Sequence, residues 1–201
     1  GNTRSHSELG SQALQRQWYF VLRHGRVGHC QAIKSLMKKY IIVTGGAGFV
    51  GSNLIELLLK KTNKKIFSID DYSSGFTRNH IKNTRIKYLK AKTISINKIL
   101  LKYRNQIDSL FHFAEFSRIY QSFEDFNRCF ESNSQGTQVV FKFCLDNKIK
   151  LIYSATSATL GNKGEDKNLS PYAFTKAKNL ELLENLKKWF NFKFEVIYFY
   201  N

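Results

Sequence analysis

Short apolar segments alternate with amphipathic segments along the chain from Met37 onward. The apolar segments have the length of buried strands and cover residues 40–43, 65–69, 86–89, 110–113, 151–154 and 194–198. Between the first two, the apolar positions of one helix face recur at Val50, Leu54, Leu57 and Leu58. This alternation predicts repeated strand–helix units, with a parallel sheet covered by helices on both faces.

A second helix start is predicted near the end of the chain. Ser170 has the chemistry of an N-cap, and Pro171 suits the first helical position because its missing N–H would have no helical partner there. The later turns of this helix are predicted to carry one apolar face, formed by Leu183, Leu186 and Phe190.

Composition changes abruptly at Met37. Residues 1–36 contain four Arg and one Lys, whereas the remainder is rich in Lys, Asn, Ile and Phe. We therefore expect residues 1–36 to be foreign to the fold or disordered, with a transit peptide as the alternative, and residues 37–201 to form the domain. The chain stops at Asn201, directly after the sixth predicted strand, so this domain is expected to be truncated.

The net charge of +17 raises the question of a nucleic-acid partner. The lysines are scattered and base-reading motifs are absent, so we expect no nucleic-acid partner. No apolar run approaches the length of a membrane span, so no membrane partner is expected. Three widely separated cysteines, Cys30, Cys129 and Cys144, favour a reducing cytoplasm over disulfides or a metal site, and Cys129 and Cys144 are expected to be buried helical thiols.

A glycine-rich turn joins the first predicted strand to the first helix. Its sequence is Gly45-x-x-Gly48-x-x-Gly51, which permits a tight turn and close approach of a pyrophosphate to the backbone. Asp70 follows Gly51 by 19 residues at the end of the second strand, where a carboxylate accepts hydrogen bonds from ribose hydroxyls. Together they predict a doubly wound Rossmann fold that binds NAD rather than NADP. Whether Arg78, which is nearby in sequence, reaches the ribose end of the cofactor stays open.

Tyr172 and Lys176 lie four residues apart on the helix that begins at Pro171. This spacing puts both side chains on one face, where the ammonium favours the phenolate and prepares it to take a proton. A hydroxyl at the end of the fifth strand is expected to meet Tyr172 over the substrate; Ser154, Thr156 and Ser157 all qualify.

Residues 37–201 resemble the extended short-chain dehydrogenase/reductases, the NAD-dependent sugar epimerase/dehydratase family. The matching motifs occur in family order: TGGAGFVGSNL, SIDDYSSG, FHFAEFSR, YSATSATLG, SPYAFTK and YFYN. They are most similar to those of UDP-glucose 4-epimerases. The resemblance implies NAD as cofactor, a nucleotide-sugar substrate, a cytoplasmic location and a homodimer at full length. It also implies that the family's C-terminal substrate domain is missing, so the chain alone is expected to bind NAD without turnover.

The resemblance also assigns residues to roles. Catalysis falls to Thr156, Tyr172 and Lys176. Substrate contacts fall to Thr156, Tyr172 and Asn201. Cofactor contacts fall to Gly45, Gly48, Phe49, Val50, Gly51, Asp70, Ala114 and Lys176.

The sequence departs from the family pattern at two places. Ala91-Lys92 stands where the third strand usually ends in Gly-Asp, whose Asp contacts adenine, and Glu115 replaces a small residue beside the expected nicotinamide ribose. The 4,6-dehydratases of the family carry Asp-Glu after the catalytic threonine, but Ser157-Ala158 follow here, which favours epimerisation. A nucleotide-sugar reductase, an epimerase at another carbon and a non-catalytic dinucleotide-binding regulatory module remain as alternatives.

Overall fold

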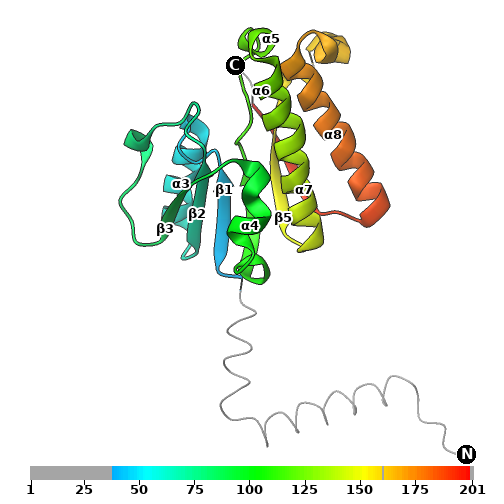
Figure 1. Ribbon diagram of the computed structural model, residues 1–201. Coiled ribbons are helices and arrows are strands. Elements are labelled where there is room, and N and C mark those ends of the chain that lie inside the picture. The colour runs from blue at the N-terminus through cyan, green and yellow to red at the C-terminus, as the bar shows by residue number, and fades with distance from the viewer. Residues whose placement is uncertain (1–37, 160, 200–201) are drawn as a thin grey trace, which may run out of the picture. The chain divides into compact units, whose positions relative to one another are not determined.

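The computed structural model describes residues 38–159 and 161–199. Within them, six parallel strands form one sheet in the order β3-β2-β1-β4-β5-β6 (Figure 1). The strands are β1 (Tyr40–Thr44), β2 (Lys65–Asp70), β3 (Ile86–Lys90), β4 (Ile107–His112), β5 (Lys150–Thr156) and β6 (Phe194–Phe199). The predicted doubly wound Rossmann fold is confirmed. The expectations for residues 1–36 and for Cys30 lie outside the described residues.

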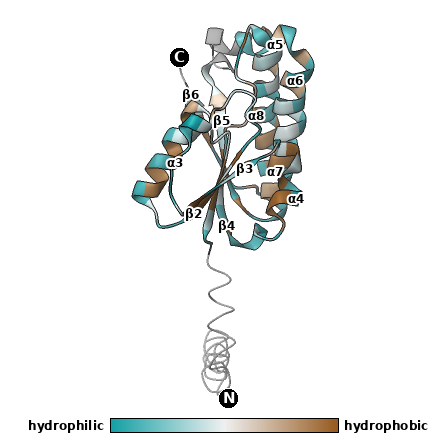
Figure 2. Ribbon diagram, turned by 60° about the vertical axis from the view of Figure 1, so that its left-hand side comes forward, coloured by the Kyte–Doolittle hydropathy of each residue, from teal (hydrophilic) through white to brown (hydrophobic). Residues whose placement is uncertain are grey.

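Helices cover both faces of the sheet, as Figure 2 shows by the position of α3 across the strands from α4, α7 and α8. The helices are α3 (Phe49–Lys61), α4 (Ile96–Leu100), α5 (Gln121–Glu124), α6 (Phe126–Phe130), α7 (Thr137–Asp146) and α8 (Pro171–Phe190). A π-helical turn, η4 (Glu131–Gly136), joins α6 to α7. Short 3₁₀ turns complete the path: η1 (Thr77–Asn79), η2 (Thr93–Ser95), η3 (Arg104–Gln106), η5 (Ser157–Thr159) and η6 (Gly161–Asn168).

Side-chain alternation along β1 divides the core in two. Ile42 points to the face covered by α4, α7 and α8, whereas Ile41 and Val43 point to the face covered by α3. Figure 2 accordingly shows apolar strands between helices whose outer surfaces are polar. Burial of both sheet faces explains why the strands read as continuous apolar runs in the sequence.

Three details of the sequence prediction are wrong. On α3, Leu57 is 50% exposed and Ile55 is fully buried, because the helix is rotated relative to the predicted stripe. On α8, Phe190 is 58% exposed, because the helix ends there, beyond the sheet it packs against. The fourth strand begins at Ile107 and ends at His112, so Phe113 belongs to the loop that follows it.

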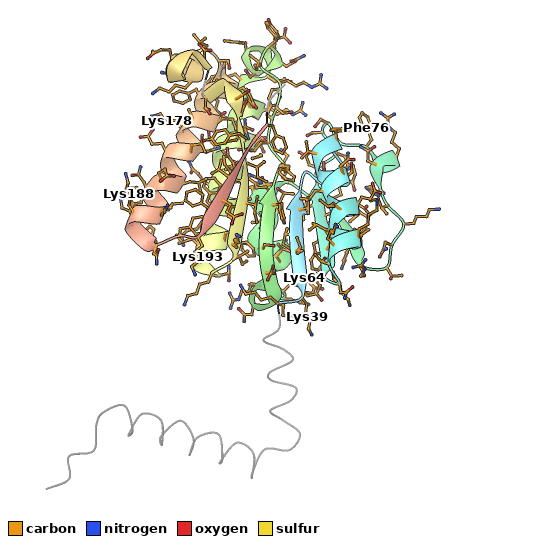
Figure 3. All side chains as sticks on the ribbon, turned by 180° about the vertical axis from the view of Figure 1, so that it is seen from behind. Lys39, Lys64, Phe76, Lys178, Lys188 and Lys193 are labelled. Carbon is orange, nitrogen blue, oxygen red and sulfur yellow. The ribbon has the colours of Figure 1, made fainter. Side chains whose placement is uncertain are left out.

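The scattered lysines lie over much of the surface rather than on one patch. In Figure 3, Lys39 and Lys64 lie near the amino ends of the strands, whereas Lys178 and Lys188 lie along α8. None of the helices among residues 38–159 and 161–199 is long and apolar enough to span a membrane. Cys129 and Cys144 are buried thiols on α6 and α7, as expected from the sequence.

Candidate active site

A cleft of about 1590 Å³ lies at the carboxyl ends of the strands. This is where doubly wound sheets bind ligands, and the volume exceeds that of an ordinary small-ligand pocket. The cleft is lined by every described residue that the sequence assigned to cofactor or catalysis: Gly45, Gly48, Phe49, Val50, Gly51, Asp70, Ala114, Thr156, Tyr172 and Lys176. Asn201 lies outside the described residues.

The glycine turn opens the cleft at the amino end of α3. Gly45 has a φ of +73°, and a Cβ there would lie 2.7 Å from the Phe113 carbonyl carbon. A Cβ on Gly51 would lie 2.2 Å from the Gly45 carbonyl oxygen, so the helix can approach the turn this closely only with glycine. The N-cap residue Gly48 makes no side-chain cap, which leaves the helix amino end open toward the cleft.

Asp70 ends β2 and is fixed by two backbone donors. Its Oδ2 accepts a hydrogen bond of 2.9 Å from the Ala47 N–H, and its Oδ1 accepts one of 2.8 Å from the Tyr72 N–H. Since a carboxylate has about four acceptor sites, capacity for ribose hydroxyls remains. Arg78 packs its guanidinium at 4.3 Å over the ring of Phe76, which lines the cleft.

Lys92 forms an ion pair with Glu131 on the wall of the cleft. The Lys92 Nζ lies 2.7 Å from a Glu131 carboxylate oxygen, and both residues line the cleft. Glu131 begins η4, so this carboxylate comes from a helical turn rather than from the third strand. The neighbouring sequence of Lys92 gave no indication that Glu131 is its partner.

Tyr172 and Lys176 are buried one turn apart in the first turns of α8. The predicted cap holds these turns in place: the Ser170 Oγ accepts a hydrogen bond of 3.0 Å from the Ala173 N–H. The Lys176 ammonium donates to the Ser154 carbonyl oxygen at 2.6 Å and contacts the Ser154 Oγ at 3.3 Å. α8 is therefore bonded directly to β5.

The three hydroxyl candidates at the end of β5 have different surroundings. The Ser154 Oγ donates to the His112 carbonyl oxygen at 2.9 Å and is buried in the core. All three residues line the cleft together with Tyr172, and Thr156 and Ser157 are half-buried. The deeper burial of Ser154 thus favours the other two as substrate-facing hydroxyls.

Glu115 forms a buried ion pair with Lys176. Its second oxygen accepts three further hydrogen bonds, from Tyr153 Oη at 3.1 Å, Thr137 Oγ1 at 2.8 Å and Asn179 Nδ2 at 3.0 Å. Burial is the main reason that the pKa of Tyr153 lies well above its usual range, and the Glu115 charge adds to it. The sequence singled out Glu115 but not its three neutral partners. The available signal was the occurrence of polar residues at positions of strands and helices that are otherwise apolar.

A chain of polar groups extends from this pair into the sheet. The Thr44 Oγ1 lies 2.7 Å from His112 Nδ1, and His112 Nε2 lies 2.9 Å from Thr137 Oγ1. Because Thr137 donates to Glu115, we assign the histidine proton to Nε2, with Nδ1 accepting from Thr44. Burial lowers the pKa of His112 to about 4, so the ring is neutral at pH 7.

Asn133 joins the loop after β4 to α8 and was also missed from the sequence. Its amide exchanges two hydrogen bonds with the backbone of Phe116, at 2.6 and 2.9 Å, and contacts Thr175 Oγ1 at 3.2 Å. It lies in the π-turn η4, a local geometry that often occurs at functional sites.

A Rossmann fold with a glycine turn, a ribose-type carboxylate and a Tyr–Lys pair on one cleft defines a dinucleotide-binding protein of the short-chain dehydrogenase type. Residues 41–201 match the model of the NAD dependent epimerase/dehydratase family. The chain belongs to this family, whose cofactor is NAD.

The matching relatives have different reactions. The chain is 31% identical over 126 residues to a UDP-N-acetyl-alpha-D-glucosaminuronate decarboxylase of Bacillus cytotoxicus, covering 62% of this chain and 39% of the relative. It is 27% identical over 146 residues to an ADP-L-glycero-D-manno-heptose-6-epimerase of Brachyspira hyodysenteriae, covering 68% and 45%. The chain thus spans less than half the length of these two curated relatives.

Solved structures of sugar-nucleotide epimerases share the fold. A UDP-N-acetylglucosamine 4-epimerase from Methanobrevibacter ruminantium superimposes with a TM-score of 0.70 at 26% identity, covering 82% of this chain and 56% of that one. The UDP-glucose 4-epimerase of Brucella ovis, solved in complex with NAD, gives a TM-score of 0.71 at 21% identity, covering 81% and 52%. The second likeness, at this low identity, concerns the fold alone.

Proposed function

We propose that the protein is an NAD-dependent nucleotide-sugar epimerase that interconverts UDP-glucose and UDP-galactose through a transient 4-keto sugar. The observation that carries the proposal is the buried Tyr172–Lys176 pair on the same cleft as the glycine turn and Asp70. Because the chain spans 39% and 45% of the two curated relatives described above, the activity is proposed for the whole gene product.

The residues of the cleft fit NAD. The open amino end of α3, with Gly45, Gly48, Phe49, Val50 and Gly51 around it, offers N–H groups and a positive dipole to the pyrophosphate. Asp70 would hold the adenine ribose, while Ala114 and Lys176 would border the nicotinamide end. When bound, NAD supplies a hydride acceptor that later returns the hydride to the sugar.

In this proposal, three side chains carry out the catalytic steps. Tyr172 takes the proton of the C4 hydroxyl as the carbon is oxidised and returns it after the keto sugar has turned over. Lys176 lies one turn from Tyr172 on the same helix and lines the same cleft, where it would border the nicotinamide. Thr156 donates a hydrogen bond to the C4 oxygen from the end of β5, and Asn201 contacts the diphosphate.

The residues after Thr156 bear on the class of reaction. Elimination of water from a 4-keto sugar needs an additional acid and base, but Ser157 and Ala158 supply no carboxylate at these positions. This supports epimerisation over dehydration. Because the same Tyr–Lys pair serves oxidation at other carbons, choice of the sugar and of C4 rests on similarity to the 4-epimerases.

Turnover is tested on the whole gene product with UDP-glucose, followed by proton NMR of the anomeric signals. We expect UDP-galactose to form, and Tyr172→Phe to lower the rate by at least about 100-fold while NADH affinity stays within a few-fold of wild type. A product other than a 4-epimer would contradict the proposed reaction. Equal rates for wild type and Tyr172→Phe would contradict the catalytic role of the tyrosine.

A further inference from the structure

Glu115 places a carboxylate where the family pattern has a small residue. The side chain is only 2% exposed, although the residue as a whole borders the cleft. It therefore turns from the cleft wall into the core, toward α8. An acidic side chain at such a position is costly to bury unless charge and hydrogen bonds compensate it.

All four partners of the carboxylate are donors. Tyr153, Thr137 and Asn179 donate to Oε1, and the Lys176 ammonium donates to Oε2. The ammonium and the amide can only donate, and in this arrangement the two hydroxyls donate as well. The surroundings of Glu115 are therefore those that a carboxylate requires.

The Lys176 ammonium is buried as deeply as its partner. Its side chain is 5% exposed, and its other contacts within hydrogen-bond distance are the carbonyl oxygen and Oγ of Ser154. Both of these are neutral groups. Glu115 is therefore the counter-ion of the one charged group that the proposed function places beside the nicotinamide.

The neighbouring titratable groups do not disturb this balance. His112 on β4 is neutral because burial lowers its pKa to about 4, and burial raises the pKa of Tyr153 on β5. The Lys92–Glu131 pair, which also lines the cleft, contributes one charge of each sign. Within the buried hydrogen-bonded cluster around Glu115, the charged groups are thus Lys176 and Glu115.

We propose that Glu115 is a positioning residue that cancels the charge of Lys176 at the nicotinamide end and thereby favours the oxidised cofactor over the reduced one. The nicotinamide ring of NAD⁺ carries a positive charge, whereas that of NADH is neutral. A lone buried ammonium would penalise NAD⁺ selectively, and a neutral ion pair removes this penalty. The inference rests on the proposed function, since it requires that this cleft bind NAD.

The ratio of the NAD⁺ and NADH dissociation constants measures this effect without any turnover. Both cofactors are titrated by calorimetry into wild type, Glu115→Gln and Glu115→Ala at pH 7 and constant ionic strength. We expect both variants to weaken NAD⁺ by about tenfold relative to NADH. Glu131→Gln is the matched control: it removes one negative charge from the same cleft, leaves the Lys176–Glu115 pair intact and is expected to keep the ratio within about twofold of wild type.

Lys176→Met supplies a test with the opposite sign, which stays informative if the Glu115 variants do not fold. It leaves the carboxylate without its counter-ion, so NAD⁺ gains relative to NADH; the double variant Glu115→Ala/Lys176→Met returns toward the wild-type ratio. Equal loss of both cofactors in the single variants, with an unchanged ratio, would mean that Glu115 is only structural and would overturn the inference. Wild type that binds neither cofactor would instead overturn the proposed function itself.

Discussion

The chemistry at the residue scale depends on one continuous set of polar groups. It begins at Thr44 on β1, passes through His112 and Thr137, and ends at the Glu115–Lys176 pair. Each group in it is buried and each has a partner, so the loss of one leaves another without its hydrogen bond. The arrangement explains why a histidine at the end of β4 and a glutamate side chain in the loop that follows are tolerated in the buried interior.

His112 makes the folding stability depend on pH. Its pKa is about 4 in the folded protein, below the ordinary value of 6.5, so the unfolded chain binds more protons between these values. The stability contributed by the neutral ring is complete above pH 6.5 and is lost as the pH falls toward 4. Between pH 7 and pH 5 we expect His112 to remove about 2 kcal/mol from the free energy of unfolding.

Urea unfolding at both pH values checks this, with His112→Asn as the comparison because it lacks the titrating ring. The variant is expected to lose less stability on acidification than wild type. Parallel losses in the two proteins would show that other groups account for the pH dependence.

Residues whose role depends on local sequence could be predicted, and those that act through distant partners could not. The glycine turn, Asp70 and the Tyr172–Lys176 spacing are defined within one strand–turn–helix unit or one helical turn. Glu115 meets Asn179 across 64 positions, and Lys92 meets Glu131 across 39. Sequence spacing contains no signal for such pairs, so both appeared only as departures from the family pattern.

At the scale of elements, α8 positions the proposed catalytic pair. Its N-cap and first-turn proline fix where the helix begins, and this sets which face carries Tyr172 and Lys176. The end of the helix was less predictable, because the apolar pattern continued to Phe190 while the contacts with the sheet ended earlier. Caps are local chemistry, whereas burial depends on the neighbouring elements.

Removal of the cap should weaken both the fold and the site. We expect Ser170→Ala to lower the free energy of unfolding by about 1 kcal/mol, because the Ala173 N–H loses its buried acceptor. Ser170→Thr, which keeps the hydroxyl, is expected to lose less. Chemical denaturation measures the difference; equal stability of wild type and Ser170→Ala would contradict a stabilising role for the cap.

At the scale of the whole molecule, strand order determines where the site lies. The strand order reverses direction between β1 and β4: β2 and β3 follow on one side, and β5 and β6 on the other. The cleft opens at the carboxyl ends of these strands. The apolar pattern sufficed to predict this architecture, because the repeat of apolar positions along a strand differs from that along a helix. The sugar specificity did not follow from it, because specificity depends on individual side chains of the cleft and the apolar pattern reports only the order of strands and helices.

Cofactor preference tests the central claim most directly. NAD⁺ and NADP⁺ are titrated by calorimetry into the chain and into Asp70→Ser. We predict that wild type binds NAD⁺ at least about tenfold more tightly than NADP⁺, because the Asp70 carboxylate repels a 2′-phosphate, and that Asp70→Ser reduces this preference. Failure of wild type to bind either dinucleotide, or tighter binding of NADP⁺, would contradict an NAD site in this cleft.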